Sequence, residues 1–218
     1  MRCFKQHSDT SKALDAIRHP DATPRIDKRL NEGVSAFDVE LRDVYLDTPP
    51  QNSSTRTKYE LEELVKLKGK SCLPNLIESS LREVVGSVLE DHGVCLPELS
   101  QKRLFSALYD VRTVCFAVQY EHRRPRPRVV APYYGVALPD TYKAYDNTPS
   151  YPSTRSTQMA FVELYLGDRR PDLETSLHEL AQQTDHTLMC TGCHYRSDIE
   201  ASHELARQLF TTLKRKPR

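Results

Sequence analysis

Apolar residues recur at helical spacing along most of this chain, and this pattern constrains the fold more than any other feature. In the segment Leu76 to Asp91, apolar residues recur every three or four positions, and Pro97 to Glu121 repeats the pattern. Such spacing places them on one face of a helix. No convincing run of alternating apolar and polar residues predicts strands. The sequence therefore predicts an all-α domain of about five or six helices.

The expected helices are separated by residues that favour helix ends. Asn75 is a candidate N-cap, and the prolines of the RRPRPR segment stop any helix that precedes them. A long loop with Pro, Tyr and Gly is expected from Pro125 to Pro152. The expected helices are Tyr59 to Lys68, Leu76 to Asp91, Pro97 to Glu121, Ser153 to Leu166, Pro171 to Thr187 and Ser197 to Leu213.

The first part of the chain has only weak periodicity. Pro20, Pro24, Pro49 and Pro50 interrupt it, and it is rich in Ser, Thr, Asp and Asn. We therefore expect an irregular N-terminal arm at 1–57, ordered against a partner, followed by one helical domain at 58–218.

Charge and hydropathy exclude some classes of function. The formal net charge is +1 and the mean hydropathy is -0.61. This balance does not predict a nucleic-acid binder, and no apolar run approaches the roughly 18 residues that a membrane span needs. The N-terminus has no apolar signal region, so a cytoplasmic or intracellular location is expected. Its mixture of basic and hydroxyl residues leaves organelle targeting open, although Asp9 and Asp15 argue against it.

The cysteines do not form the pattern of a disulfide framework. Six of them are scattered along the chain, and reduced thiols are the expectation. Cys190, Cys193 and His194 spell CxxCH, which is also the attachment pattern of c-type haem, and a CxxC pair can bind zinc. We favour simple packing of these two cysteines, and thus predict no metal and no cofactor.

Three segments carry residues that suit an oxyanion site. They are HRRPRP (His122 to Pro127), PSYPSTRSTQ (Pro149 to Gln158) and GCHYRSDIEA (Gly192 to Ala201). A phosphate needs several donors and cations, and the start of a helix offers free amides and a favourable dipole.

Histidine in the third segment can act as a nucleophile. Asp198 lies four residues after His194, so its carboxylate can orient the imidazole and leave one nitrogen free to attack phosphorus. A pair at this spacing is, on its own, often only a surface or capping interaction. Arg126 likewise is, out of context, typical of a solvated basic turn.

Taken together, the three segments resemble the phosphatidic acid phosphatase type 2 / vanadium haloperoxidase superfamily, and its soluble acid phosphatases in particular. Ser153 precedes His194 by 41 residues, which is typical of that family. The resemblance covers roughly Tyr59 to Leu213 and implies a helical bundle of the acid phosphatase/haloperoxidase type.

The resemblance also implies roles for individual residues. His194 would be the nucleophile, Asp198 its orienting partner, and Arg126 and Ser153 oxyanion contacts. Arg155 would restore a positive charge near the phosphate, and we expect all five to converge in one pocket. Further candidates to supply positive charge are His186, Arg123 and Arg124.

Several family positions are replaced. Gln119 stands where the family has Lys, Thr154 where it has Gly, Arg155 where it has His, and Leu188 where it has Arg. Two cations and the proton donor to the leaving group are therefore absent, and phosphoryl transfer depends on such charge stabilisation.

These replacements predict a catalytically impaired phosphatase-like domain that binds phosphate or another oxyanion. Such a domain would act as a binding or structural component with protein partners in a larger assembly. The alternative is an active phosphomonoesterase that forms a phosphohistidine at His194. Haloperoxidase chemistry with vanadate ranks last, because the dense cationic pocket that it needs is the part most altered.

Overall fold

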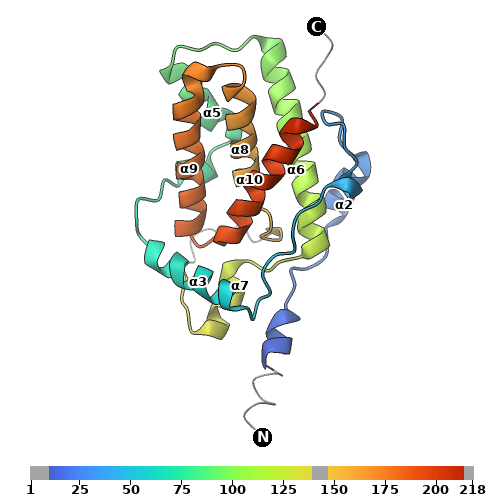
Figure 1. Cartoon of the computed structure of the whole chain (residues 1–218), viewed down its shortest axis with the longest axis vertical. Coiled ribbons are helices and arrows are strands. Elements are labelled where there is room, and N and C mark those ends of the chain that lie inside the picture. Colours follow the sequence, from blue (N-terminus) through green and yellow to red (C-terminus); the bar gives the residue numbers. More distant parts are fainter. Residues whose placement is uncertain (1–9, 139–146, 214–218) are drawn as a thin grey trace, which may run out of the picture.

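The computed structural model describes residues 10–138 and 147–213. Helices make up most of this part, which contains no strand, and one isolated antiparallel bridge joins Phe37 to Leu213 (Figure 1). The all-α prediction is confirmed. The elements are α2 (Pro24–Glu32), η1 (Leu41–Asp43), α3 (Thr55–Leu67), α4 (Asn75–Glu78), α5 (Leu81–Asp91), α6 (Glu98–His122), α7 (Pro127–Val130), η2 (Ala131–Tyr134), α8 (Thr154–Gly167), η4 (Pro171–Leu173), α9 (Glu174–Cys190) and α10 (Arg196–Thr211).

Helix α8 lies at the centre of the bundle and contacts α6, α9 and α10 (Figure 1). Its interior face is apolar, and Met159, Phe161 and Val162 are fully buried against its neighbours. Burial of such side chains contributes most of the stability of a helical bundle. The packing fixes the starts of α8 and α10, where two of the predicted site segments lie.

Capping interactions define these two helix starts. The Ser153 hydroxyl accepts a hydrogen bond from the Ser156 amide at 3.3 Å, as an N-cap does. At α10, the Asp198 carboxylate accepts from the Tyr195 amide at 2.9 Å. The serine and the aspartate that the sequence singles out therefore also hold the backbone of their own helices.

The single helix expected from Leu76 to Asp91 is wrong, because the chain breaks between α4 and α5. Ser80 is the N-cap of α5, and its side chain and that of Glu83 form a reciprocal capping box. This local alternative satisfies amides that a continuous helix would bond internally. Asn75 is the first residue of α4 rather than a cap.

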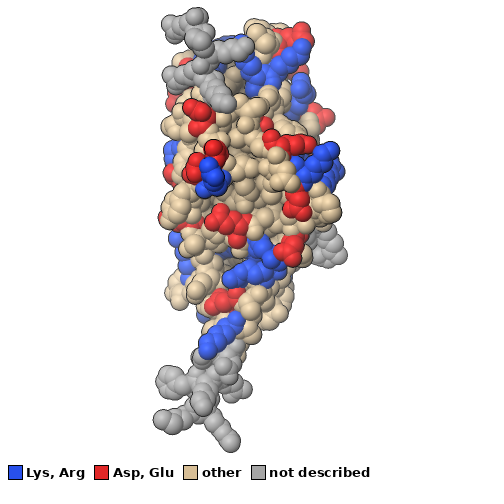
Figure 2. All heavy atoms as spheres, turned by 90° about the vertical axis from the view of Figure 1, so that its right-hand side faces the viewer, with Lys and Arg blue, Asp and Glu red and all other residues tan. Residues whose placement is uncertain are grey.

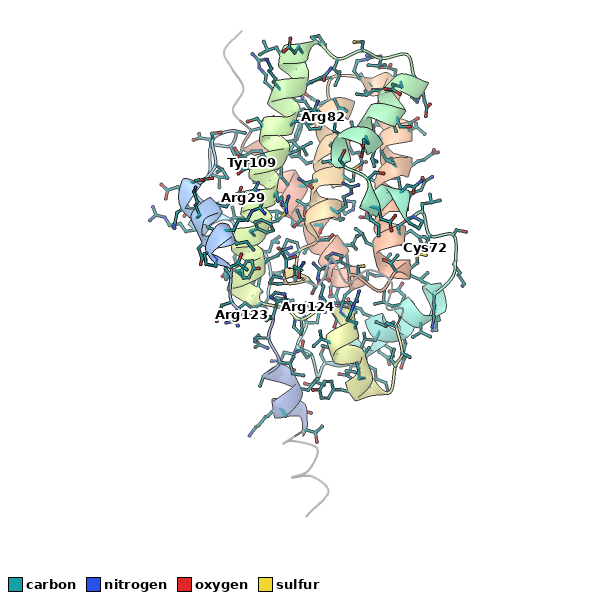
Figure 3. The ribbon with its side chains drawn as sticks, turned by 180° about the vertical axis from the view of Figure 1, so that it is seen from behind. Arg29, Cys72, Arg82, Tyr109, Arg123 and Arg124 are labelled. Carbon is teal, nitrogen blue, oxygen red and sulfur yellow. A yellow bond between two sulfur atoms is a disulfide. The ribbon has the colours of Figure 1, made fainter. Side chains whose placement is uncertain are left out.

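The described part of the N-terminal arm packs on the bundle of its own chain. Arg29 of α2 lies 3.6 Å over the Tyr109 ring of α6 and donates to the Thr113 hydroxyl at 2.8 Å (Figure 3). Phe37 and Leu46 are buried in the main core. The division of the chain at residue 57 stays a prediction, but the arm shares its core with the helices.

The loop expected from Pro125 to Pro152 contains the short helices α7 and η2. Residues 139–146 of this loop lie outside the described residues. Its final part returns to the bundle through Ser150, whose amide donates to the Arg124 carbonyl at 3.0 Å, and through a cis peptide bond between Tyr151 and Pro152. This return brings the second predicted site segment against the first.

The prediction that all cysteines are reduced is wrong for one pair, since Cys72 and Cys190 form a disulfide. The two residues are 118 positions apart, and the connection between α3 and α4 brings Cys72 to the end of α9. Cys95, which is exposed, and Cys115 and Cys193, which are buried, are not part of this disulfide.

On one face of the molecule, basic and acidic side chains are interspersed (Figure 2). This mixture agrees with the near-neutral net charge. Among the described helices, none is both long and apolar enough to cross a membrane.

Candidate oxyanion site

His194 lies in the tight turn between α9 and α10. The turn depends on Gly192, whose φ of 71° is in the left-handed region that favours glycine. The amides of Cys193 and His194 both donate to the Leu188 carbonyl, at 3.1 and 3.2 Å. The backbone of His194 is thus fixed by the last turn of α9.

Both imidazole nitrogens of His194 have partners. Nδ1 lies 2.9 Å from the Ser150 carbonyl and 3.3 Å from Asp198 Oδ2, while Nε2 lies 2.6 Å from Arg126 Nη1. A guanidinium can only donate, so Nε2 is the acceptor and Nδ1 carries the proton. This tautomer directs the basic nitrogen toward Arg126.

His194 is buried and uncharged at neutral pH. Burial lowers its pKa to about 4, and the positive charge of Arg126 acts in the same direction, against the opposing effect of Asp198. A neutral imidazole with an oriented lone pair is the form that can act as a nucleophile or accept a proton.

Asp198 is part of a buried network of charged side chains. Burial would raise its pKa, but the Arg124 guanidinium, the hydrogen bond to His194 and the Tyr195 amide together hold the pKa below its ordinary value. Arg124 Nη1 lies 2.7 Å from Asp198 Oδ1, and Arg124 Nη2 lies 3.2 Å from Glu60 of α3. Asp198 therefore stays ionised and can accept a hydrogen bond from the protonated Nδ1 of His194.

Arg126 is buried beside His194 and is held from several sides. It donates to the Thr148 carbonyl and hydroxyl, both at 3.0 Å, and to the Cys193 carbonyl at 3.1 Å. These bonds fix the planar guanidinium, so that its positive charge is held beside His194.

Arg126 and His194 lie at the wall of a cavity of about 340 Å³. The cavity is bounded by α6, by the start of α8 and by the turn before α10. The described residues that line it are Arg112, Phe116, Arg126, Asn147, Thr148, Thr154, Arg155, Gln158 and His194. Its lining therefore combines guanidinium groups with a helix N-terminus, which is an arrangement that favours anions.

The predicted site residues differ in their relation to this cavity. Arg126, Arg155 and His194 line it, and Asp198 lies directly behind His194. Ser153 is fully buried, caps α8, and does not line the cavity, where its neighbour Thr154 stands instead. The role of Ser153 as an oxyanion contact stays a prediction.

Arg155 lies at the cavity but is anchored elsewhere. Its guanidinium donates to the Leu76 carbonyl at 2.9 Å and to the Ser79 carbonyl at 2.7 Å. These contacts tie α8 to the break between α4 and α5. Arg155 therefore contributes positive charge at the wall of the cavity, from a position fixed by the backbone of another element.

Two of the positions that the resemblance marks as replaced have structural roles here. Gln119 is buried and donates to the Pro152 carbonyl at 2.7 Å and to the Thr154 hydroxyl at 3.1 Å. Leu188 packs in a buried apolar cluster with Leu64 and Ile77. The neutral side chains at these positions thus stabilise the surroundings of the cavity without adding charge to it.

The other candidate cations do not line the cavity. Arg123 donates to the His19 carbonyl and pairs with Asp21 of the arm, and His186 lies 3.0 Å from the Lys70 carbonyl. Arg124 is close to the site, but it pairs with Glu60 and Asp198 and is not among the residues that line the cavity.

Glu60 is the network residue that sequence reasoning missed. It accepts hydrogen bonds from the Ser197 amide and hydroxyl, at 3.0 and 2.9 Å, and pairs with Arg124. On the sequence it is one of several charged residues on an amphipathic helix. The only available signal was its position on the apolar side, next to Leu61 and Leu64.

Comparison with known proteins adds no relative. No protein-family model matches the chain, and no curated protein matches it. The likeness to the phosphatidic acid phosphatase type 2 superfamily therefore rests on the three segments and stays a prediction.

Proposed function

We propose that this chain is a catalytically impaired, phosphatase-like helical domain whose cavity binds phosphate or a similar oxyanion. The observation that carries the proposal is the contact of 2.6 Å between Arg126 Nη1 and His194 Nε2 at the cavity wall. An oxyanion that enters there would be attracted by the positive charge of Arg126 and by the N-terminus of α8. Such a site suits a binding or structural component of an assembly.

Weak catalysis follows from what lines the cavity. Among its described lining residues, His194 is the only side chain whose ordinary pKa is near neutrality. If His194 attacks phosphorus, no second group of this kind remains there to protonate the leaving oxygen. A missing general acid commonly costs about 10²- to 10⁴-fold in rate.

One observation favours the alternative, an active phosphomonoesterase. Asp198 and the Ser150 carbonyl both accept from His194 Nδ1 and so hold the proton on that nitrogen. Nε2 is then the unprotonated nitrogen of an oriented imidazole, as attack on phosphorus requires. A leaving group of low basicity would need little protonation. Activity toward aryl phosphates, with loss of activity in His194→Asn, would establish this alternative.

The proposal is tested by calorimetry with inorganic phosphate and vanadate. We expect Arg126→Met to weaken binding by about 10- to 100-fold, because the positive charge at the wall of the cavity is lost. Arg169→Met is the matched control. Arg169 is half exposed, donates to the Tyr165 carbonyl and pairs with Asp168, and it follows the C-terminal end of α8, whereas the cavity lies at the N-terminal end. Circular dichroism establishes that each variant is folded.

A chromogenic aryl phosphate assay completes the experiment. We expect the wild type to show no hydrolysis above the His194→Asn variant. Absence of phosphate and vanadate binding by the folded wild type would overturn the proposal, as would equal binding by wild type and Arg126→Met.

A further inference from the structure

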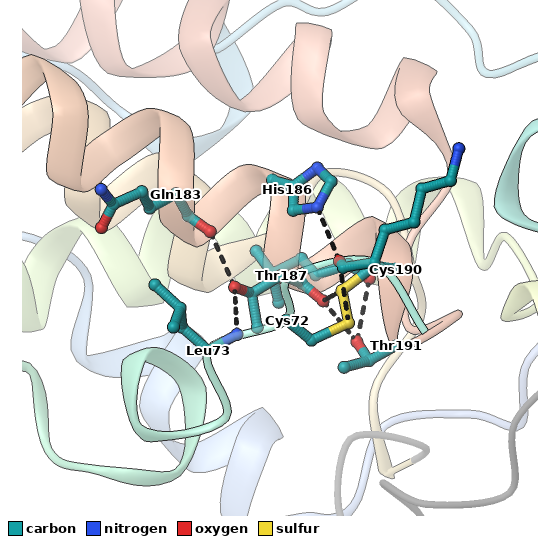
Figure 4. Close-up of a disulfide and its surroundings, with 9 residues drawn as sticks. Cys72, Leu73, Gln183, His186, Thr187, Cys190 and Thr191 are labelled. Carbon is teal, nitrogen blue, oxygen red and sulfur yellow. Dashed lines mark hydrogen bonds between the residues drawn. A yellow bond between two sulfur atoms is a disulfide. The ribbon is translucent and has the colours of Figure 1, made fainter. Parts of the chain in front are cut away.

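The disulfide joins two parts of the chain beside the oxyanion site. Cys72 lies in the connection between α3 and α4, and Cys190 is the last residue of α9, four residues before His194 (Figure 4). The bond therefore crosslinks a surface connection to the helix that leads into the His194 turn.

Two hydrogen bonds accompany the covalent link. The Leu73 amide donates to the Thr187 hydroxyl at 3.2 Å, and His186 Nε2 lies 3.0 Å from the Lys70 carbonyl (Figure 4). All three contacts reach the last turn of α9. The disulfide is the covalent part of this attachment, and each hydrogen bond adds only about 0.5–1.5 kcal/mol.

The last turn of α9 in turn holds the site. The Leu188 carbonyl accepts from the amides of Cys193 and His194, and the Cys193 carbonyl accepts from Arg126 Nη1 at 3.1 Å. A displacement of the turn would shift the imidazole and one of the groups that fix Arg126. The crosslink and the oxyanion contacts are therefore connected through one helical turn.

The two sulfur atoms differ in accessibility. Cys190 is buried, whereas Cys72 is partly exposed. Ser71 and Leu73, on either side of Cys72, line a surface hollow of about 350 Å³ next to His186. An external thiol can approach Cys72 from this side, and access of this kind governs which sulfur of a disulfide is attacked.

We propose that Cys72–Cys190 is a reversible thiol switch on the oxyanion site, opened by a dithiol reductant that attacks Cys72. This inference rests on the proposed function for its effect on ligand binding. In the oxidised form the crosslink holds the His194 turn in the geometry described above. In the reduced form the connection between α3 and α4 is released from α9, and oxyanion binding weakens.

The exchange reaction is balanced within the two dithiol pairs. A thiolate of the reductant forms a bond to Cys72 Sγ, and the electron pair of the broken S–S bond leaves on Cys190 Sγ, which takes up a proton. The second thiolate of the reductant then attacks its own sulfur in the mixed disulfide and releases Cys72. The reductant leaves as a disulfide, and two electrons have passed to the protein.

The test compares the oxidised and reduced full-length protein. Inorganic phosphate binding is measured by calorimetry after the reductant is removed, and hydrogen exchange is measured for the amides of 187–196. We expect reduction to weaken phosphate binding by about tenfold, within the usual range of coupling between sites, and to speed exchange in this segment. Cys72→Ser should behave like the reduced protein under all conditions.

Cys95→Ser provides the matched control, because Cys95 is an exposed free thiol outside the bond. This variant should respond to reduction as the wild type does. Equal phosphate affinity and unchanged exchange in oxidised, reduced and Cys72→Ser protein would overturn the switch. So would failure of Cys72 and Cys190 to pair under oxidising conditions, detected by alkylation and mass spectrometry.

Failure of the proposed function gives a different result. If neither redox form binds phosphate, the proposed function and the effect on binding both fall. Hydrogen exchange then tests whether the disulfide controls the His194 turn. Faster amide exchange at 187–196 on reduction supports this control, and unchanged amide exchange overturns it.

Discussion

His194 has a protonation state that can be measured directly. Because burial and Arg126 lower its pKa to about 4, its ring signals should titrate far below the ordinary value of 6.5 in an NMR pH series. Removal of the neighbouring positive charge in Arg126→Met should raise the pKa toward the ordinary value, while burial keeps it below. A wild-type His194 that titrates near 6.5 would contradict the buried arrangement.

The same shift has a consequence for stability. A histidine whose folded pKa lies below its unfolded pKa takes up its proton first in the unfolded chain. The contribution of His194 to the free energy of unfolding is therefore complete above 6.5 and falls as the pH decreases toward about 4. In His194→Asn this part of the acid dependence should be absent.

At the residue scale, the sequence predicted much of the site but not its support. The spacing of His194 and Asp198 placed them on one turn, and the structure brings Arg126 to the same imidazole. The Glu60–Arg124 pair depends on contact between segments 64 positions apart, which no local pattern contains. The hydroxyl of Ser153 caps α8 instead of contacting the cavity, a role that serines at the start of helices commonly have.

At the scale of elements, the break between α4 and α5 is set by local capping. Ser80→Ala removes the side-chain acceptor of the capping box, so we expect the free energy of unfolding to fall by about 0.5–2 kcal/mol in urea denaturation. Ser87→Ala, at an exposed position within α5, should change it by less than about 0.5 kcal/mol. Equal effects of the two substitutions would show that the cap does not stabilise α5.

Helical periodicity located the long helices but not this break. Apolar residues continue at helical spacing through Leu76, Leu81 and Val85, so the pattern gives no sign that the backbone turns. The pair Ser79 and Ser80 is the local signal, and its meaning depends on Glu83 three residues later. Periodicity describes which face is buried, whereas capping residues decide where each helix begins.

For the whole molecule, the arm is part of the core. Phe37 is buried, packs edge-on against Phe161 of α8 at a ring distance of 5.6 Å, and pairs with Leu213 at the end of α10. We expect Phe37→Ala to lower the free energy of unfolding by about 3–5 kcal/mol, because it leaves a cavity between arm and bundle. Tyr45→Ala, at a side chain that is 71% exposed, is the control and should have little effect.

Thermal and urea unfolding can measure this difference. A loss below about 1 kcal/mol for Phe37→Ala would show that the bundle is stable without the arm. Composition alone could not reveal the contact, since the prolines and polar residues around Phe37 are also typical of a solvated extension.

The buried network of Glu60, Arg124, Asp198 and Arg126 has a meaning beyond the geometry of one site. Apolar side chains of equal volume often stabilise a protein interior as well as buried ion pairs do, and folding alone does not require such a group of charges. Asp198 and Arg126 contact His194, and Arg124 and Glu60 lie behind Asp198, so the cavity beside His194 offers a reason for this buried charge that packing alone does not.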